Sequence, residues 1–136
     1  MIVVDSSVWI TVFSRAETRY TAALRDAIAT GKVAVADLVL MEVLRGATSD
    51  LAAQTLLREM AAFPTVQIGG RDLAIRAATH YRALRAVGVT VRSVIDVLLA
   101  TYCIEGRHTL LHGDRDFGHF ERFGLDAVNA GSAASP

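Results

Sequence analysis

The chain opens with a short apolar run, Ile2-Val3-Val4, that leads directly to a single carboxylate, Asp5. An uninterrupted apolar run of this kind is typical of a parallel strand buried on both faces. Ser6 and Ser7 follow, and either would be a favourable N-cap for a helix carrying the next apolar residues. We therefore expect Asp5 at the carboxyl end of a strand, the edge at which open parallel sheets bind ligands. A purely structural role, in which Asp5 only accepts hydrogen bonds from the next helix's amides, is the alternative.

The rest of the chain alternates apolar, strand-like runs with segments of helical periodicity. Strands are expected over 32–36, 65–68, 109–111 and 125–128, and helices over 18–30, 38–45, 51–63, 71–87, 94–105 and, raggedly, 114–120. Strands separated by helices of this length favour an α/β fold with a parallel sheet covered on both faces. We expect one domain over residues 1–129 with four to five parallel strands, and a small, polar, disordered tail over 130–136.

The overall charge is balanced, with 14 basic and 14 acidic residues, so no global field directs the chain to nucleic acid or to a membrane. Cys103 is the only cysteine, which excludes an intrachain disulfide and fits a reducing compartment. No signal peptide precedes the first strand, and no apolar run is long enough to span a bilayer. A cytoplasmic protein without membrane association is therefore expected.

Glu42 is the second acidic residue in a notable context, because every other residue from 38 to 44 is apolar. A helix that is apolar all round is largely buried. An unpaired buried carboxylate costs on the order of several kcal/mol. Either Glu42 pairs with Arg45 one turn away, or it faces a functional cleft.

Asp96 lies in a similar apolar helix, 94–100, three residues after Ser93. The spacing Ser-x-x-Asp is that of a capping box, which accounts for an acid at this position without any chemistry. An acid in the first turn of a core helix is also well placed to face a cleft. Capping and ligand binding do not exclude each other.

A fourth acidic motif follows the strand 109–111, where a glycine turn leads to Asp114 and Asp116. Polar turn residues after a strand are common, so this motif alone is weak evidence. Two of the four motifs follow strand ends and two lie in apolar helices, an arrangement that allows all of them to converge on one sheet edge. Gathered carboxylates repel one another unless a cation neutralises them.

Oxygen ligands without a His or Cys cluster suit a hard ion, Mg²⁺ or Mn²⁺. Such an ion, held by few carboxylates, is suited to phosphodiester hydrolysis. The histidines have no metal-ligand spacing and are expected on the surface or in turns: His80, His108, His112 and His119.

Four segments together form a family pattern: Ile-Val-Val-Asp5-Ser-Ser-Val-Trp, Glu42-Val-Leu-Arg-Gly, Val-Arg-Ser-Val-Ile-Asp96-Val-Leu-Leu-Ala and Leu-Leu-His-Gly-Asp114-Arg-Asp116-Phe. In order and spacing they resemble PIN-domain proteins, specifically the VapC toxins of bacterial type II toxin–antitoxin systems. The resemblance covers residues 1–128 and implies a three-layer α/β/α PIN-like fold. It also implies Mg²⁺- or Mn²⁺-dependent endoribonuclease activity, a VapB-type antitoxin partner, and assembly as a homodimer or as a hetero-oligomer with the antitoxin.

The resemblance also implies roles for individual residues. The family's acidic quartet corresponds to Asp5, Glu42, Asp96 and Asp114, with Asp116 sharing the last role. Asp5 and Asp96 would be the principal metal ligands, while Glu42 and Asp114 would adjust the binding of metal, water or a second metal. Three hydroxyl residues would be polar supports of the site: Ser6, Ser7 and Ser93. Ser6 departs mildly from the family, which often has Thr there, and the hydroxyl is kept.

Four arginines near these motifs are candidate RNA contacts: Arg82, Arg85, Arg92 and Arg115. Guanidinium groups there would hold phosphates and partly cancel the acidic field. Solvated helix faces and salt bridges are the alternative, above all for Arg82 and Arg85. A neutral chain does not bind RNA tightly by charge alone, so we expect specificity to come from the shape of the RNA target.

Five apolar positions are candidates for a groove that receives antitoxin helices, with core packing as the alternative for each: Val12, Phe13, Leu51, Leu56 and Leu57. The function expected is a divalent-metal endoribonuclease toxin. A catalytically idle binding module that acts as co-repressor with its antitoxin is the alternative, although loss of an acid would mark it and all are present. A receiver-type phosphoacceptor would need a lysine near a late strand, and the only lysine here is Lys32.

Overall fold

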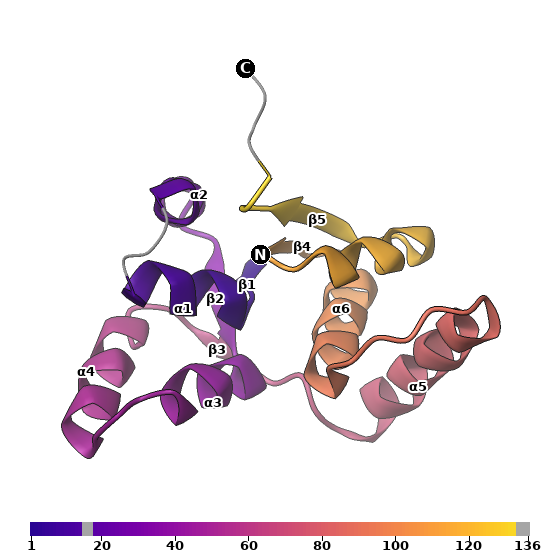
Figure 1. The fold of residues 1–136 in the computed structure, drawn as a ribbon, viewed down its shortest axis with the longest axis horizontal. Helices are drawn as coiled ribbons and strands as arrows, with labels where there is room; N and C mark the ends of the chain where they lie inside the picture. Colours follow the sequence, from indigo (N-terminus) through magenta and orange to yellow (C-terminus); the bar gives the residue numbers. More distant parts are fainter. Residues whose placement is uncertain (15–17, 133–136) are drawn as a thin grey trace.

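A computed structural model describes residues 1–14 and 18–132 of the chain. Its centre is a sheet of five strands in the order β3-β2-β1-β4-β5, with every neighbouring pair parallel (Figure 1). The strands are β1 (Ile2–Val4), β2 (Val33–Ala36), β3 (Thr65–Val66), β4 (Thr109–His112) and β5 (Asp126–Asn129). The expected α/β fold with four to five parallel strands is confirmed.

Helices cover both faces of this sheet. The chain steps from β1 to β2 and β3 through α1 (Ser6–Ser14), α2 (Thr18–Ala29), α3 (Asp37–Arg45) and α4 (Asp50–Met60). It then crosses to the other side of β1 through α5 (Arg71–Ala86) and α6 (Val94–Gly106), and a 3-10 helix, η1 (Arg115–Phe123), joins β4 to β5. Because such crossovers are right-handed, connections that run in opposite directions place their helices on opposite faces, as Figure 1 shows.

The direction of the connections reverses at β1, so β1 and β4 are neighbours whose following segments diverge. In open parallel sheets this switch point leaves a crevice at the carboxyl ends of the two strands. α1 follows β1 on one side of this switch point, and η1 follows β4 on the other (Figure 1). The crevice is therefore built from segments far apart in the sequence.

The apolar strand runs form the core, as their pattern predicts. Val3, Val4 and Leu110 have no exposed surface, and all four positions of β2 are buried. Trp9 fixes α1 on this core, because its Nε1 donates to the Val4 carbonyl at 3.1 Å while its ring stacks on Phe13. The side-chain direction of α1 is thereby set by the end of β1.

Several boundaries differ from the sequence-based expectation. The helix expected to residue 63 ends at Met60, the helix expected over 114–120 is η1, and the last strand lies one residue later than expected.

Two further differences concern β3 and the C-terminal segment. β3 ends at Val66 rather than at residue 68, because the Ile68 N–H donates to the Asp37 side chain at 3.1 Å and not to a neighbouring strand. Of the segment 130–136, Ala130 is buried and its N–H donates to the His112 carbonyl at 2.7 Å. Residues 133–136 lie outside the described part of the chain. In the described part, no helix is long and apolar enough to cross a bilayer.

Candidate active site

Asp5 lies at the carboxyl end of β1, where its N–H donates to the Leu111 carbonyl of β4 at 2.8 Å. Its Oδ2 accepts from the Ser7 N–H at 3.0 Å and from the Ser7 hydroxyl at 2.5 Å. Because α1 begins at Ser6, Asp5 itself occupies the N-cap position, and the expectation that Ser6 or Ser7 is the cap is wrong. The Asp5 carboxylate thus satisfies the Ser7 N–H, one of the amides in the first turn of α1 that have no partner within the helix.

Capping accounts for only one of the two carboxylate oxygens of Asp5. Its Oδ1 is buried and has no hydrogen-bond partner, and the same holds for Oε1 of Glu42. Within residues 1–14 and 18–132, these are the buried side-chain oxygens or nitrogens left unsatisfied. A buried carboxylate oxygen without a partner destabilises the fold. The purely structural interpretation of Asp5 therefore does not explain why Oδ1 is unpartnered.

Glu42 projects from α3 with its side chain 12% exposed. Burial raises its pKa, and the charge of Asp5 raises it further, while the Ser6 side chain and Arg45 act in the opposite direction. The expected pair with Arg45 exists, but the Arg45 Nη2 to Glu42 Oε2 distance is 3.9 Å and the Arg45 side chain is 66% exposed. A solvated pair of this length contributes little. It also leaves Oε1 unpartnered.

Asp96 lies in the first turn of α6, and its N–H donates to the Ser93 hydroxyl at 3.3 Å, which confirms Ser93 as the N-cap. The Asp96 side chain is buried, and burial is the largest cause that raises its pKa to about 7. The negative charges of Asp5, Asp114 and Glu42 raise it further. Carboxylates from the ends of β1 and β4 and from α3 and α6 therefore lie within electrostatic range of one another.

Asp114 is the N-cap of η1, and its Oδ1 accepts from the Asp116 N–H at 2.9 Å. Asp114 is half-buried beside the carboxylates named above and raises the pKa of Asp5 as well as that of Asp96. Asp116, also half-buried, takes part through its backbone amide. Arg115 between them is exposed.

Ser7 connects the two strand ends that flank the crevice. Its hydroxyl donates to Asp5 Oδ2 and accepts from the Gly113 N–H at 2.9 Å. One side chain of α1 thus ties the loop after β4 to the carboxylate after β1. The neighbouring Ser6 side chain interacts instead with Glu42, whose pKa it lowers against the larger effect of burial. The two serines therefore support different acids.

His112 contradicts the expectation that the histidines lie on the surface or in turns, since it is only 4% exposed. Its Nδ1 accepts from the Asp114 N–H at 3.1 Å, and its ring packs against Phe117 at 4.9 Å. Burial lowers its pKa, so it supports the Asp114 turn as a neutral side chain. The one sequence signal for this role was its place at the end of an otherwise apolar strand.

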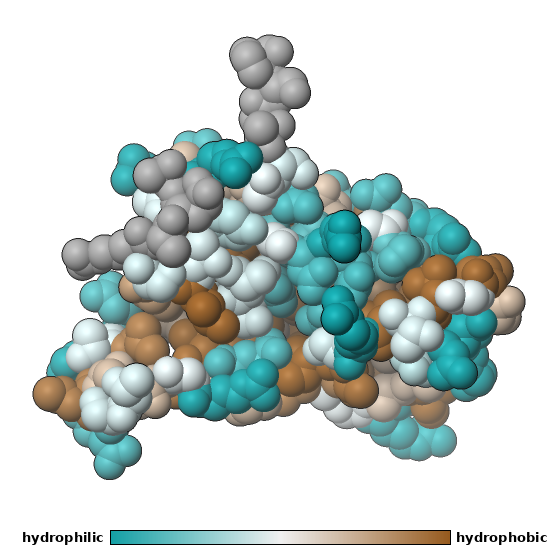
Figure 2. All heavy atoms as spheres, viewed as in Figure 1, coloured by the Kyte–Doolittle hydropathy of each residue, from teal (hydrophilic) through white to brown (hydrophobic). Residues whose placement is uncertain are grey.

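The four arginines considered as RNA contacts, Arg82, Arg85, Arg92 and Arg115, are all exposed. Arg85 also contacts its own helix, with its guanidinium carbon 6.0 Å from the centre of the Tyr81 ring. Arg92 immediately precedes the Ser93 cap of the helix that carries Asp96, and Arg115 lies between Asp114 and Asp116 in the sequence. Figure 2 shows hydrophilic side chains gathered on the face between α1 and α6.

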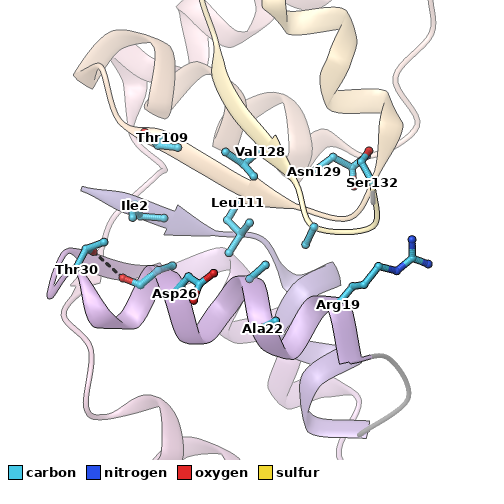
Figure 3. Close-up of a pocket in the computed structure, with 13 residues that line it drawn as sticks. Ile2, Arg19, Ala22, Asp26, Thr30, Thr109, Leu111, Val128, Asn129 and Ser132 are labelled. Carbon is cyan, nitrogen blue, oxygen red and sulfur yellow. Dashed lines mark hydrogen bonds between the residues drawn. The ribbon is translucent and has the colours of Figure 1, made fainter. Parts of the chain in front are cut away.

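Two grooves of similar volume lie elsewhere on the described part of the chain. One, of about 600 Å³, lies between α2 and the face of β1, β4 and β5 (Figure 3). The other, of about 610 Å³, lies between α1, α3 and α4 and is lined by Phe13, Leu51 and Leu56 of the five apolar positions singled out from the sequence. Val12 is half-buried against the core, and Leu57 is 47% exposed.

The acids do not form a direct metal cage in the described part of the chain. In residues 1–14 and 18–132, no three His, Cys, Asp or Glu side chains are gathered tightly enough to hold an ion by themselves. Mg²⁺ usually keeps several waters and takes only one or two protein carboxylates. The unpartnered oxygens of Asp5 and Glu42, together with mutual repulsion among the acids, fit a hydrated hard cation of this kind.

Comparison with known proteins places this geometry in a family context. Residues 2–123 match the PIN domain. A VapC ribonuclease from Mycobacterium bovis is 31% identical over 119 residues, which cover 86% of this chain and 89% of that protein. Among solved structures, FitAB bound to a DNA fragment is similar with a TM-score of 0.74 at 18% identity, covering 99% of each chain. VapBC2 from Rickettsia felis, bound to a promoter DNA fragment, is similar with a TM-score of 0.72 at 18% identity, covering 95% of this chain and 98% of that one.

Proposed function

This chain belongs to the PIN-domain family and, within it, to the VapC ribonucleases, and we propose that it is a divalent-metal-dependent endoribonuclease acting as the toxin of a VapBC-type pair. The observation that carries the proposal is the acidic crevice at the switch point of the sheet. There Asp5, Glu42, Asp96 and Asp114 repel one another, and two buried carboxylate oxygens have no partner. An endoribonuclease of this kind hydrolyses RNA phosphodiester bonds.

Mg²⁺ or Mn²⁺ is the cofactor that the oxygen-only donor set favours. When bound, such an ion would lower the pKa of an attacking water and offset the negative charge that develops on the phosphate. Asp5, through Oδ1, and Asp96 are the proposed principal ligands. Glu42 and Asp114, with Asp116 behind Asp114, would adjust the binding of metal or water.

The remaining site residues hold these acids and the substrate. Ser7 fixes one oxygen of Asp5 and leaves the other free, and Ser93 fixes the first turn of α6 that carries Asp96. Arg92 and Arg115 would hold RNA phosphates near the acids, and Arg82 and Arg85, exposed on α5, would be further contacts. Because the chain has no net charge, recognition would depend on the shape of the target RNA.

A VapB-type antitoxin is the proposed partner, and it would silence the toxin by covering the acidic crevice. The groove between α1 and α4 is the proposed seat of an apolar antitoxin helix, since Ile10 and Leu51 are exposed there at 47% and 69%. Figure 2 shows hydrophobic side chains over this part of the molecule. Assembly as a homodimer, or as a hetero-oligomer with the antitoxin, in the cytoplasm completes the proposal.

The second candidate is an idle binding module that acts as a co-repressor. The observation in its favour is that the FitAB and Rickettsia felis VapBC2 structures are both bound to DNA fragments. This function would need the antitoxin groove but not the acids. Growth arrest on expression of the chain without an antitoxin would favour the toxin over the idle module.

The test is RNA cleavage by the purified protein with Mg²⁺ or Mn²⁺, with EDTA, and with Asp96→Asn. Asp72→Asn is the matched control, because Asp72 is an exposed acid, its side chain 79% exposed, paired with Arg71. Cleavage that requires both the metal and Asp96, and survives Asp72→Asn, is the expected result. Metal-independent cleavage, or full cleavage by Asp96→Asn, would contradict the proposed site.

A further inference from the structure

We propose that Tyr20 of α2 is a positioning residue: its ring holds the turn at Gly113 against Ser7 and thereby sets the orientation of Asp5. The consequence for metal binding rests on the proposed function. The contact itself does not, so the two are testable separately.

The first step is the close approach of Tyr20 to the backbone of Gly113. A Cβ placed on Gly113 would lie 2.4 Å from Tyr20 Cε1 and 2.5 Å from its hydroxyl oxygen. Distances this short are not sustained between real atoms. Gly113 is therefore the residue that lets the ring lie directly on the main chain of the turn after β4.

The second step is that the same side chain also reaches the turn after β5. A Cβ placed on Gly131 would lie 2.7 Å from the Tyr20 hydroxyl oxygen. Figure 3 shows why: the start of α2, marked by Arg19, faces the carboxyl end of β5, marked by Asn129 and Ser132. Tyr20 thus lies between two neighbouring turns at the carboxyl edge of the sheet.

The third step connects this contact to the site. The Gly113 N–H donates to the Ser7 hydroxyl at 2.9 Å, and that hydroxyl gives its single hydrogen to Asp5 Oδ2. While the Gly113 amide occupies a lone pair of Ser7, the hydroxyl hydrogen stays aimed at Oδ2, and Oδ1 is left without a hydrogen-bond partner. If Gly113 retreats, the Ser7 hydroxyl is free to rotate, and Asp5 Oδ2 is then held by the Ser7 N–H at 3.0 Å without the hydroxyl.

Groups that hold a ligand from behind typically change metal affinity by about 10- to 100-fold when removed. Because Tyr20 acts through two intermediates, we expect about a tenfold loss, at the lower end of that range. Tyr20→Phe keeps the ring atoms that meet Gly113 and should retain most of the affinity. Gly113→Ala should weaken binding in the native background, yet add nothing once Tyr20→Ala has removed the ring.

The experiment measures Mn²⁺ affinity by electron paramagnetic resonance for the native chain, Tyr20→Ala, Tyr20→Phe, Gly113→Ala and the Tyr20→Ala/Gly113→Ala double variant. Tyr102→Ala is the control, because Tyr102 is a half-buried tyrosine that stacks on His108 at the amino edge of the sheet. Hydrogen exchange of the Gly113 amide in metal-free protein is the second readout. Thermal unfolding of each variant identifies any that do not fold.

The expected pattern is weak Mn²⁺ binding and fast Gly113 exchange in Tyr20→Ala, with both restored in Tyr20→Phe and unaffected in Tyr102→Ala. Native Gly113 exchange together with native Mn²⁺ affinity in folded Tyr20→Ala would overturn the inference. If the native chain itself binds no Mn²⁺, the proposed function fails, while the exchange measurement still decides the role of Tyr20.

Discussion

Asp5 and Asp96 oppose each other across the crevice: after burial, the charge of Asp5 is the largest cause that raises the pKa of Asp96 to about 7. The two residues stand 91 positions apart in the sequence: Asp5 lies at the end of β1, and Asp96 lies in the first turn of α6. Their repulsion destabilises the metal-free chain, and a cation bound between them would offset it.

Neutralising Asp5 should lower the pKa of Asp96. In metal-free Asp5→Asn the negative neighbour is gone, so Asp96 ionises more readily and its pKa falls below about 7, while burial keeps it above the ordinary value of 3.8. Titration of the Asp96 side-chain carbon by NMR measures this. Asp72→Asn, which changes an exposed acid on α5, should leave the Asp96 titration where it is.

Asp5→Asn should also abolish cleavage without unfolding the chain. The amide of asparagine is neutral, and its single oxygen would stay with the two Ser7 donors, so the nitrogen would take the place of Oδ1 and could not bind a cation. The substitution also relieves repulsion among the acids. Thermal stability of the metal-free protein should therefore be kept or raised. We expect at least a hundredfold loss of RNA cleavage, on the order of what removal of a principal charged group costs an enzyme. Cleavage by Asp5→Asn at the native rate would exclude Asp5 as a ligand.

The metal-free chain should lose stability as the pH rises from about 4 to about 7. The pKa of Asp96 is raised in the folded state, so the folded chain binds more protons than the unfolded chain between 3.8 and about 7. The stabilisation that comes from protonated Asp96 is therefore complete below pH 3.8. It is lost as the pH rises through the folded pKa of about 7, and the loss is at most about 4 kcal/mol. Urea unfolding in EDTA at several pH values measures it.

A comparison with Asp96→Asn separates the contribution of Asp96 from that of the buried histidines. Burial lowers the pKa values of His80 and His112, so these histidines cause the fold to lose stability as the pH falls below about 6.5. This pH dependence is opposite to that of Asp96. Asp96→Asn keeps both histidines, so the difference between it and the native chain reports Asp96 together with its repulsion of the other acids. A pH-independent difference would contradict the raised pKa.

Arg107→Gly should stabilise the fold. Arg107 ends α6 with a φ of 55°, the one left-handed non-glycine residue in residues 1–14 and 18–132. Glycine adopts this conformation without the Cβ clash, so a gain of about 1 kcal/mol is expected. Arg107→Ala keeps the Cβ and is the matched control. Equal effects of the two substitutions in urea unfolding would show that charge, not backbone strain, matters there.

Leu51→Asp should weaken antitoxin binding by at least tenfold, because it places a charge in the apolar groove between α1 and α4. Its side chain is already 69% exposed, so the fold should tolerate the change. Ile75→Asp, at a 51% exposed position on α5 on the other face, is the control. Calorimetric titration with the cognate antitoxin decides; equal losses in both variants would place the antitoxin elsewhere.

Local sequence patterns predicted most of the architecture. The apolar runs of β1, β2 and β4, the Ser93 cap and the long helices were identifiable because each depends on residues only a few positions apart. The candidate acids were identifiable for the same reason. An acid at the end of a buried strand or inside an apolar helix is conspicuous in its immediate context.

Tertiary structure alone decided how those acids are held. His112 was buried at the end of β4, and Ile68 was drawn out of β3 by Asp37, 31 positions away in the sequence. The Ser7 hydroxyl was fixed by the Gly113 amide, and Gly113 lies against Tyr20. Sequence determined which residues carry charge and which elements carry them, because periodicity and capping are local. Which oxygen remains free to bind a cation depends on contacts between distant segments, and only the folded sheet brings those segments together.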